Sequence, residues 1–372
     1  MSSIPTLAAS IAAAAAAEAE AEAEATRTGV PTNVTMLAAV RHRYGAPVEP
    51  TTTQTPTPGE GEVLVKVHAA GVDRGTCHVH TGTPYLMRLV GFGLTRPKQP
   101  VLGMDLSGVV AAVGPDVSRF SPGDEVFGIG NGTFAHYAIA AADKLSHKPN
   151  SLSHTLAAAL PISGGTALQA VRDHGRVEPG HRVLILGASG GVGSYAVQLA
   201  KVFGAEVTGV ASGPKLDMVR ALGADVVIDY RSDDPLAAAG CYDVIIDIGG
   251  RNPIRRLRRA LAEKGTLVIV GGEGGNRITG GIGRQLSAAA ISPFISQRLM
   301  FFIAGEGRES TDTLAHLAST GAITPKVNHQ YRLDQVQDAL EDLATGRVKG
   351  KGVIQIADEL ADALPKEGRD EN

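Results

Sequence analysis

Two different rhythms of apolar and polar residues divide the chain. Between Val40 and Leu145, short Val-rich runs are separated by Gly, Pro and Asp, as in EVLVKVHAAGV, DLSGVVAAVG and DEVFGIG. Short runs bounded by turn residues predict a compact, mostly antiparallel β domain. From about Ser151 to Ala322, apolar strand-like runs alternate with amphipathic helical runs. This alternation predicts a parallel sheet with helices on both faces.

The two ends of the chain lack both rhythms. Residues 1–35 are a low-complexity Ala/Glu segment that we expect to be disordered, and residues 358–372 form a charged tail. The first segment lacks the basic start of a signal peptide and is too acidic for a mitochondrial transit sequence. Met36 is an alternative start, because the strand-like MLAAVRH follows at once. Just before the tail, HQYRLDQVQDALEDLATGRVKGKGVIQI predicts strand, helix, strand. Its periodicity leaves open which of the two domains it joins.

Length, charge and cysteine content narrow the class of protein. A chain of 372 residues exceeds the usual size of one core, which favours two domains. The net charge of −3 predicts no nucleic acid or membrane partner. Two cysteines, Cys77 and Cys241, cannot build a disulfide framework, and no apolar run reaches bilayer length. We therefore expect a soluble, cytoplasmic protein that acts on a small molecule.

The stretch VLILGASGGVGSYAVQLA predicts a strand that runs through a glycine turn into a helix. In this context Gly190 and Gly191 let the backbone approach a pyrophosphate, and Gly193 lets the helix pack on the strand. Ala188 occupies the first glycine position of the usual dinucleotide fingerprint, and a merely structural turn is the disfavoured alternative. The cofactor-contacting residues predicted here are Ala188, Ser189, Gly190, Gly191, Val192 and Gly193.

The next strand end indicates which dinucleotide binds. An acidic residue there would hold the ribose of NAD, but the sequence has Ala211 and Ser212. Ser212 can donate a hydrogen bond to a 2′-phosphate, and Lys215 adds a positive charge, so NADPH is the predicted cofactor. The alternative for Lys215 is a solvated surface lysine. Gly271 and Gly272, after the strand-like TLVIV, are also assigned to the cofactor site.

The segment GVDRGTCHVHTG raises the question of a metal site. It places Asp73, Cys77, His78 and His80 within eight positions. Carboxylate, thiolate and imidazole are zinc ligands. Closeness in sequence alone does not decide whether these side chains meet.

Several motifs in a fixed order identify a family resemblance. They are GVDRGTCHVHTGTPY, PVLGMDLSGVVAAVG, FSPGDEVFG, AAALPISGGTALQAV, LGASGGVGSYAVQLAK, LGADVVIDY and TGRVKGKGVIQI, between about Met36 and Ile356. The chain resembles the medium-chain dehydrogenase/reductase superfamily, specifically its zinc-free branch around quinone oxidoreductase and the reticulon-interacting mitochondrial reductases.

The resemblance implies an α/β fold with two domains. Residues 36–155 and 325–357 would form a mostly β, GroES-like catalytic domain, and residues 156–324 an NADP-binding Rossmann domain with a doubly wound parallel sheet. The segment after about Thr324 would rejoin the first domain, and the active site would lie in the cleft between them. Tyr230 matches a residue that helps to hold the 2′-phosphate. The family's usual dimers make a homodimer possible.

The resemblance also answers the metal question. The three ligand positions of zinc-dependent members correspond to Asp73, Met104 and Ile162. Methionine and isoleucine cannot complete a catalytic zinc site, which needs three protein ligands, so no metal is predicted. Without a Lewis acid, hydride transfer suits an acceptor that is already conjugated.

These arguments predict a zinc-independent, NADPH-dependent oxidoreductase that reduces a quinone or an α,β-unsaturated carbonyl. A zinc-free alcohol dehydrogenase and a non-catalytic NADPH-binding regulatory module are the alternatives. Tyr85 is the first candidate for proton delivery, because related enoyl reductases carry a tyrosine near this loop.

Three further residues are candidates for the catalytic side. His78 could relay protons or only contact ribose or solvent, and Asp73 could bind substrate or only brace its loop. Thr166 could orient the nicotinamide carboxamide or only cap a helix. The Gly-rich segment from Ile278 to Ser310 could form a flap with Phe301 or Phe302 in the substrate pocket, although core packing is favoured for both phenylalanines.

Overall fold

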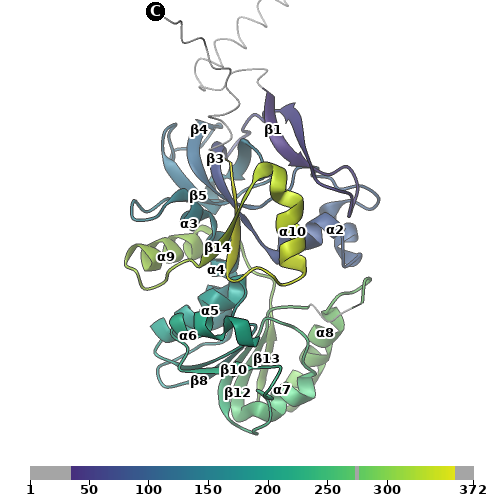
Figure 1. Ribbon diagram of the computed structural model, residues 1–372, viewed down its shortest axis with the longest axis vertical. Helices are drawn as coiled ribbons and strands as arrows, with labels where there is room; N and C mark the ends of the chain where they lie inside the picture. Colours follow the sequence, from purple (N-terminus) through teal and green to yellow (C-terminus); the bar gives the residue numbers. More distant parts are fainter. Residues whose placement is uncertain (1–34, 273–275, 357–372) are drawn as a thin grey trace, which may run out of the picture.

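The computed structural model describes residues 35–272 and 276–356. Two sheets lie one above the other along the long axis of the molecule (Figure 1). The upper sheet has seven strands and the lower has six, with a separate two-stranded pair, β1 (Thr35–Val40) and β2 (Glu49–Gln54), beside the upper one. The extension predicted over residues 1–35 ends in strand β1, which begins at Thr35. Its residues 1–34 and the predicted tail 358–372 lie outside the described residues, as does residue 357.

The upper sheet contains the Val-rich runs of the N-terminal half. Its core is β3 (Glu62–Val72), an eleven-residue strand that pairs antiparallel with both β4 and β6. The apolar side chains of β3, including Val63, Val65 and Val67, are fully buried. The neighbouring strands are β4 (Asp105–Val113), β5 (Glu125–Ile129), β6 (Tyr137–Ala141) and β7 (Leu145–His147).

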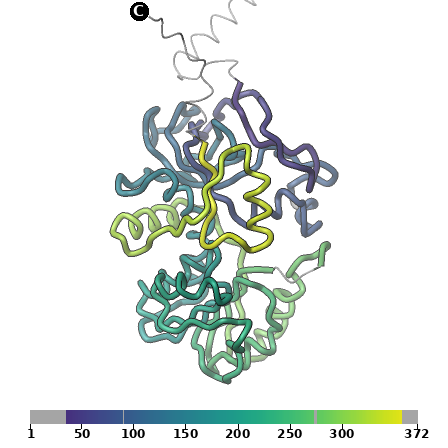
Figure 2. The backbone as a smooth tube through the Cα atoms, in the orientation of Figure 1, coloured from purple at the N-terminus to yellow at the C-terminus, as the bar shows by residue number. Residues whose placement is uncertain are grey.

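The C-terminal segment joins this same sheet. It forms β14 (Val327–Arg332), α10 (Val336–Ala344) and β15 (Lys351–Gln355), the strand, helix and strand that its periodicity predicts. β15 pairs antiparallel with β3, and β14 pairs parallel with β15. Figure 2 shows the yellow end of the chain crossing back over the purple and blue N-terminal half.

The lower sheet is entirely parallel, with the strand order β10-β9-β8-β11-β12-β13. The order reverses between β8 and β11, so this is the topological switch point where ligands bind in doubly wound sheets. The predicted Rossmann arrangement is therefore confirmed. The strands are β8 (Arg182–Leu186), β9 (Glu206–Ala211), β10 (Val226–Asp229), β11 (Tyr242–Asp247), β12 (Leu261–Ile269) and β13 (Arg298–Phe301).

Helices cover both faces of the lower sheet. Ile185 of β8 packs in one apolar cluster with Tyr195, whereas its neighbour Leu184 packs in another with Leu257. Successive strand residues point to opposite faces, which explains the two clusters. The helices of the first face are α4 (Pro161–Leu168), α5 (Gly191–Val202), α6 (Leu216–Ala221) and α9 (Arg308–Ser319), and those of the second are α7 (Ile254–Ala260) and α8 (Ile282–Ile291).

The segment expected to form a flap is more regular than predicted. It contains helix α8 and the sixth strand β13, because its apolar residues pack on the second face of the sheet. Phe301 is 41% exposed, so core packing is wrong for this residue. Phe302 packs against the first cluster and also lines the cleft described below, so both alternatives apply to it. No helix among the described residues is long and apolar enough to cross a membrane.

Candidate active site

A cleft of about 1660 Å³ lies at the switch point of the parallel sheet. Its walls come from the carboxyl ends of β8, β9, β11 and β12, from α2 (Arg74–Thr81) and the loop after it, and from the segment before β15. The glycine turn and the segment Asp73–Pro84 therefore face one common space. The cleft is large enough for a dinucleotide and a small substrate together.

The glycine turn is shaped by close backbone contacts. Helix α5 begins at Gly191 after the extended Gly190, leaving the first N–H groups of a twelve-residue helix directed toward the cleft. A Cβ atom on Gly193 would lie 2.1 Å from the carbonyl oxygen of Gly187, so only glycine lets the helix pack so closely on the turn. This donor arrangement fits the pyrophosphate of a dinucleotide.

The predicted glycine-turn residues divide into two groups. Ser189, Gly190, Gly191 and Val192 line the cleft. Ala188 is fully buried, and neither it nor Gly193 is among the described residues that line the cleft. Gly271 and Gly272, the other predicted glycines, also line it. A Cβ on Gly271 would lie 1.9 Å from the carbonyl oxygen of Ile248, which shows how closely the ends of β11 and β12 approach.

Three predicted phosphate-binding residues lie at one end of the cleft. Ser212, Lys215 and Tyr230 all line it. The Lys215 ammonium donates to the carbonyl oxygens of Gly346 (2.8 Å) and Val348 (3.1 Å). Its pKa is lowered, first by burial and then by neighbouring cations. This lysine therefore also clasps the segment before β15 to the parallel sheet.

Sequence reasoning missed Arg231 at the same end. This arginine follows Tyr230 directly and lines the cleft beside it. The order of a strand end, a tyrosine and an arginine could have suggested a second cation here. Arg347, from the loop before β15, lines the cleft as well. The Arg347 guanidinium is paired with the Asp342 carboxylate at 2.6 Å, and Asp233 and Asp234 line the cleft after Arg231. Lys215 and Arg231 are therefore the cations at this end that favour an anionic group.

The predicted catalytic residues lie mostly at the other end. Asp73, His78 and Thr166 line the cleft. Asp73 caps α2, because its carboxylate accepts from the Thr76 N–H at 2.9 Å. The His78 Nδ1 lies 3.0 Å from the Thr83 carbonyl oxygen, and the Thr166 hydroxyl donates to the Ile162 carbonyl at 2.7 Å. Each of these side chains already has a local partner.

Tyr85 lies differently from the other three. It is not among the described residues that line the cleft, and it is 40% exposed. The guanidinium of Arg88 lies 4.7 Å from the centre of its ring. The ring of Tyr85 therefore packs beside Arg88 and does not line the cleft.

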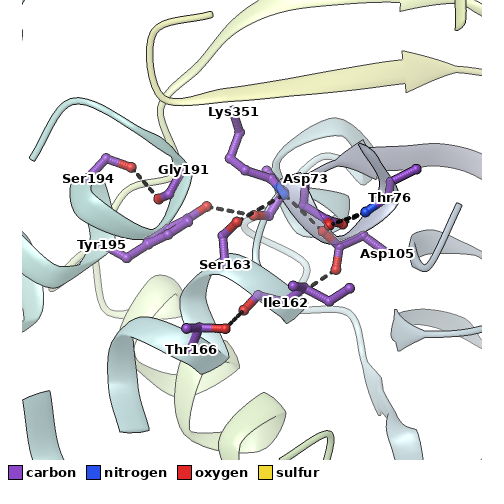
Figure 3. A network of polar contacts seen from close by, with 11 residues as sticks. Asp73, Thr76, Asp105, Ile162, Ser163, Thr166, Gly191, Ser194, Tyr195 and Lys351 are labelled. Atoms are coloured by element: carbon purple, nitrogen blue, oxygen red, sulfur yellow. Dashed lines mark hydrogen bonds and ion pairs between the residues drawn. The ribbon is translucent and has the colours of Figure 1, made fainter. Parts of the chain in front are cut away.

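A buried ionic network lies between the glycine turn and the segment that begins at Asp73 (Figure 3). The Lys351 ammonium lies 2.9 Å from the Asp105 carboxylate and donates to the Ser163 hydroxyl at 3.2 Å. Asp105 also accepts from the Ile162 N–H at 2.8 Å. Burial raises the pKa of Asp105 to about 6, although Lys351 opposes this effect. Lys351 is 1% exposed and Asp105 is fully buried, so each charge depends on the other.

This network touches the glycine turn directly. A Cβ on Gly191 would lie 3.0 Å from the Ser163 hydroxyl oxygen and 3.2 Å from the Lys351 side chain. Lys351 and Ser163 also line the cleft. The sequence motif TGRVKGKGVIQI includes Lys351, but nothing local in it indicates that a residue so far along the chain meets Asp105.

The segment Asp73–His80 does not gather metal ligands. Among the described residues, no group of three His, Cys, Asp or Glu side chains is close enough to hold a metal ion. Cys77 packs against the cluster of the upper sheet, and its Sγ lies 3.9 Å from the Leu340 carbonyl oxygen. The Asp73 carboxylate is instead used to cap this helix, where it accepts from the Thr76 N–H.

Comparison with known proteins indicates the class of protein to which the chain belongs. Residues 59–150 match the alcohol dehydrogenase GroES-like domain, and residues 222–354 match the zinc-binding dehydrogenase family. The human mitochondrial NAD(P)H oxidoreductase RTN4IP1 is 35% identical over 334 residues, covering 79% of this chain and 82% of that protein. The 2-methylene-furan-3-one reductase of Solanum lycopersicum is 31% identical, covering 79% of this chain and 72% of its own.

A solved structure agrees with these relatives. The quinone oxidoreductase from Coxiella burnetii superposes with a TM-score of 0.75 at 29% identity, covering 87% of this chain and 99% of its own. Two domains around a dinucleotide cleft define a nucleotide-dependent oxidoreductase. The chain belongs to the medium-chain dehydrogenase/reductase superfamily, which confirms the resemblance drawn from its motifs.

Proposed function

We propose that this protein reduces a quinone or an α,β-unsaturated carbonyl compound with NADPH and without a catalytic metal. One observation carries the proposal. The glycine turn, a cationic end with Lys215 and Arg231, and a polar wall with Asp73 and His78 line a single cleft. The relatives' names, an NAD(P)H oxidoreductase, an enone reductase and a quinone oxidoreductase, support it.

The residues at the cationic end bind the cofactor. The N–H groups at the start of α5 hold the pyrophosphate, and Gly191 leaves room for it. Ser212, Lys215 and Tyr230 hold the 2′-phosphate, with Arg231 as a further cation. Bound NADPH would supply the hydride.

The residues at the polar end orient the carbonyl compound. A conjugated acceptor needs placement and a proton more than it needs polarisation by a metal. His78 has an imidazole in the cleft and is the proton donor or relay, while Asp73 and Thr166 orient substrate and carboxamide through hydrogen bonds. Tyr85, the first candidate from the sequence, is tested against His78 below.

Steady-state NADPH oxidation with a panel of acceptors tests the proposal. We expect turnover of quinones and enones, faster with NADPH than with NADH, that survives a chelator and accompanies substoichiometric zinc. Turnover of saturated aldehydes alone would instead indicate an alcohol dehydrogenase. Tight NADPH binding with no turnover would indicate a regulatory module, and stoichiometric zinc removed together with activity would overturn the metal-free mechanism.

The location of the protein in the cell stays a prediction. The small number of cysteines favours a reducing compartment such as the cytoplasm. The relative RTN4IP1 is named as a mitochondrial protein. Fractionation of the native cells with an antibody against the chain decides between these compartments.

A further inference from the structure

An exposed apolar surface borders the substrate end of the cleft. Leu89 is 68% exposed and Leu94 is 63% exposed. They lie in the segment between α2 and β4, and Ile278, 64% exposed, lies in the segment before α8. The apolar rim, as we name this surface, consists of Tyr85, Leu86, Leu89, Phe92, Leu94 and Ile278.

The two segments of the apolar rim are joined across the cleft. The Tyr85 N–H donates to the Arg277 carbonyl at 2.8 Å, and the Leu86 N–H donates to the Ile278 carbonyl at 3.1 Å. The apolar rim is thus one continuous structure with contributions from both halves of the molecule.

Inner and outer faces of this structure differ in their surroundings. Thr83, Pro84 and Met87 line the cleft, whereas Leu86 and Leu89 are exposed outside it. Arg277 and Thr279 likewise line the cleft on either side of the exposed Ile278. The apolar rim is therefore the outer face of a wall whose inner face bounds the substrate end.

The exposed side chains stand on an anchored backbone. The Arg88 guanidinium donates to the Gly82 carbonyl at 2.8 Å and stacks 4.3 Å from the centre of the Tyr44 ring. The Tyr44 hydroxyl donates to the Phe92 carbonyl at 2.6 Å. Their exposure is a feature of the fold, because polar contacts fix the segment while its apolar side chains point outward.

Charge around the apolar rim is of one sign. The sequence has no Asp or Glu from 82 to 104 or from 276 to 297, although the whole chain has a net charge of −3. Arg96 and Lys98 are exposed, and no described residue forms an ion pair with either of them. Apolar side chains next to such cations match an anionic lipid surface.

We propose that the apolar rim docks this protein on the surface of an anionic lipid bilayer. Leu89, Phe92 and Leu94 enter the headgroup region, and Arg96 and Lys98 contact lipid phosphates. The overall composition predicts no membrane partner, because the local cationic surface is averaged away in the net charge. If the proposed function holds, docking brings the wall of the substrate end to the bilayer, where lipophilic quinones dissolve.

Cosedimentation of the full chain with vesicles tests the docking. We expect binding to phosphatidylcholine vesicles that contain phosphatidylglycerol, and at least tenfold weaker partition onto pure phosphatidylcholine. The double variant Leu89→Gln/Leu94→Gln should reduce partition at least tenfold. The variant Arg96→Gln/Lys98→Gln should remove the preference for anionic vesicles. Val202→Gln, an exposed apolar residue at the end of α5, serves as the matched control and should bind like the wild type.

Three results would overturn the docking. The first is a wild-type protein that stays in the supernatant, and the second is a Leu89→Gln/Leu94→Gln protein that sediments as well as the wild type. The third is a wild-type dimer that this double variant splits into monomers in sedimentation velocity, which would assign the apolar rim to a second copy of the chain. Vesicle binding is measured without turnover, so an inactive protein that binds vesicles would refute the proposed reaction alone.

Discussion

The two ends of the cleft present different chemical groups, mainly backbone N–H groups at one end and polar side chains at the other. At the cofactor end, the glycine turn and the start of α5 present backbone N–H groups to the cleft. At the substrate end, the polar side chains Asp73, His78 and Thr166 each contact backbone of their own neighbourhood. The cofactor end is therefore preformed, whereas a substrate must compete with, or add to, existing hydrogen bonds. The geometry of the cofactor end is determined by its local sequence, because it is made by backbone groups. The geometry of the substrate end depends on how distant segments fold together.

The largest expected effect comes from the ionic network that the two ends share. Lys351→Met leaves the buried Asp105 carboxylate without its cation, which costs about 3 to 5 kcal/mol of unfolding free energy. Urea unfolding measures this loss. The double variant Asp105→Asn/Lys351→Met should recover most of it, because no buried charge remains. Equal losses of unfolding free energy in the single and double variants would mean that packing, not charge, stabilises this ionic network.

The same variant has a defined pH dependence. Burial already raises the pKa of Asp105 from 3.8 to about 6, and loss of Lys351 raises it further. Below that raised pKa the folded state holds a proton that the unfolded state releases, so the Lys351→Met protein gains stability as pH falls. Its deficit relative to the wild type should be smaller at about pH 5 than at about pH 8.

A second prediction tests the preformed cofactor end. Gly193→Ala places a methyl group 2.1 Å from the Gly187 carbonyl oxygen, which should cost about 2 to 3 kcal/mol and disturb NADPH binding. Gly190→Ala is the matched control, because its nearest contact is an ordinary 3.6 Å. That protein should keep wild-type stability in urea and bind NADPH more weakly in a fluorescence titration. Wild-type stability of Gly193→Ala would show that the helix can move off the turn.

A third prediction concerns the 2′-phosphate. Lys215→Ala should weaken NADPH binding roughly tenfold to a hundredfold, about 1 to 3 kcal/mol, and leave NADH binding nearly unchanged. Because Lys215 also clasps the segment before β15, Lys349→Ala is the control. Lys349 lies in the segment before β15 and donates to the Pro214 carbonyl, so it also links this segment to the parallel sheet. It is not among the described residues that line the cleft. Equal weakening of both cofactors by Lys215→Ala would assign the lysine to the clasp alone.

The cofactor end could be predicted from sequence because its determinants are local. A strand, a glycine turn and a helix within twenty residues carry the geometry of the turn, and Ser212 and Lys215 follow at the next strand end. The parallel order of the sheet followed from the alternation of strands and helices. Helix α8 and strand β13 escaped prediction, since short apolar runs near glycines do not distinguish flap from strand.

The substrate end could be predicted only in part because its determinants are far apart in sequence. Lys351 meets Asp105 across 246 positions, through the return of β15 to β3. Tyr85 lies outside the cleft lining, where its N–H donates to the Arg277 carbonyl of the segment before α8. Neither contact has a local signature. The residue limits of the two domains remain a proposal. The Asp105–Lys351 pair links the two segments, 36–155 and 325–357, that are assigned to the catalytic domain.

The smallest expected effect decides which side chain moves a proton at the substrate end. His78→Gln should lower kcat for an enone about tenfold, because it removes the only imidazole that lines the cleft among the described residues. Tyr85→Phe should stay within about twofold of the wild type, because its ring packs by Arg88 outside the cleft lining. Stopped-flow NADPH oxidation at saturating substrate measures both. The reverse result would return proton delivery to Tyr85 and require this segment to turn inward when substrate binds.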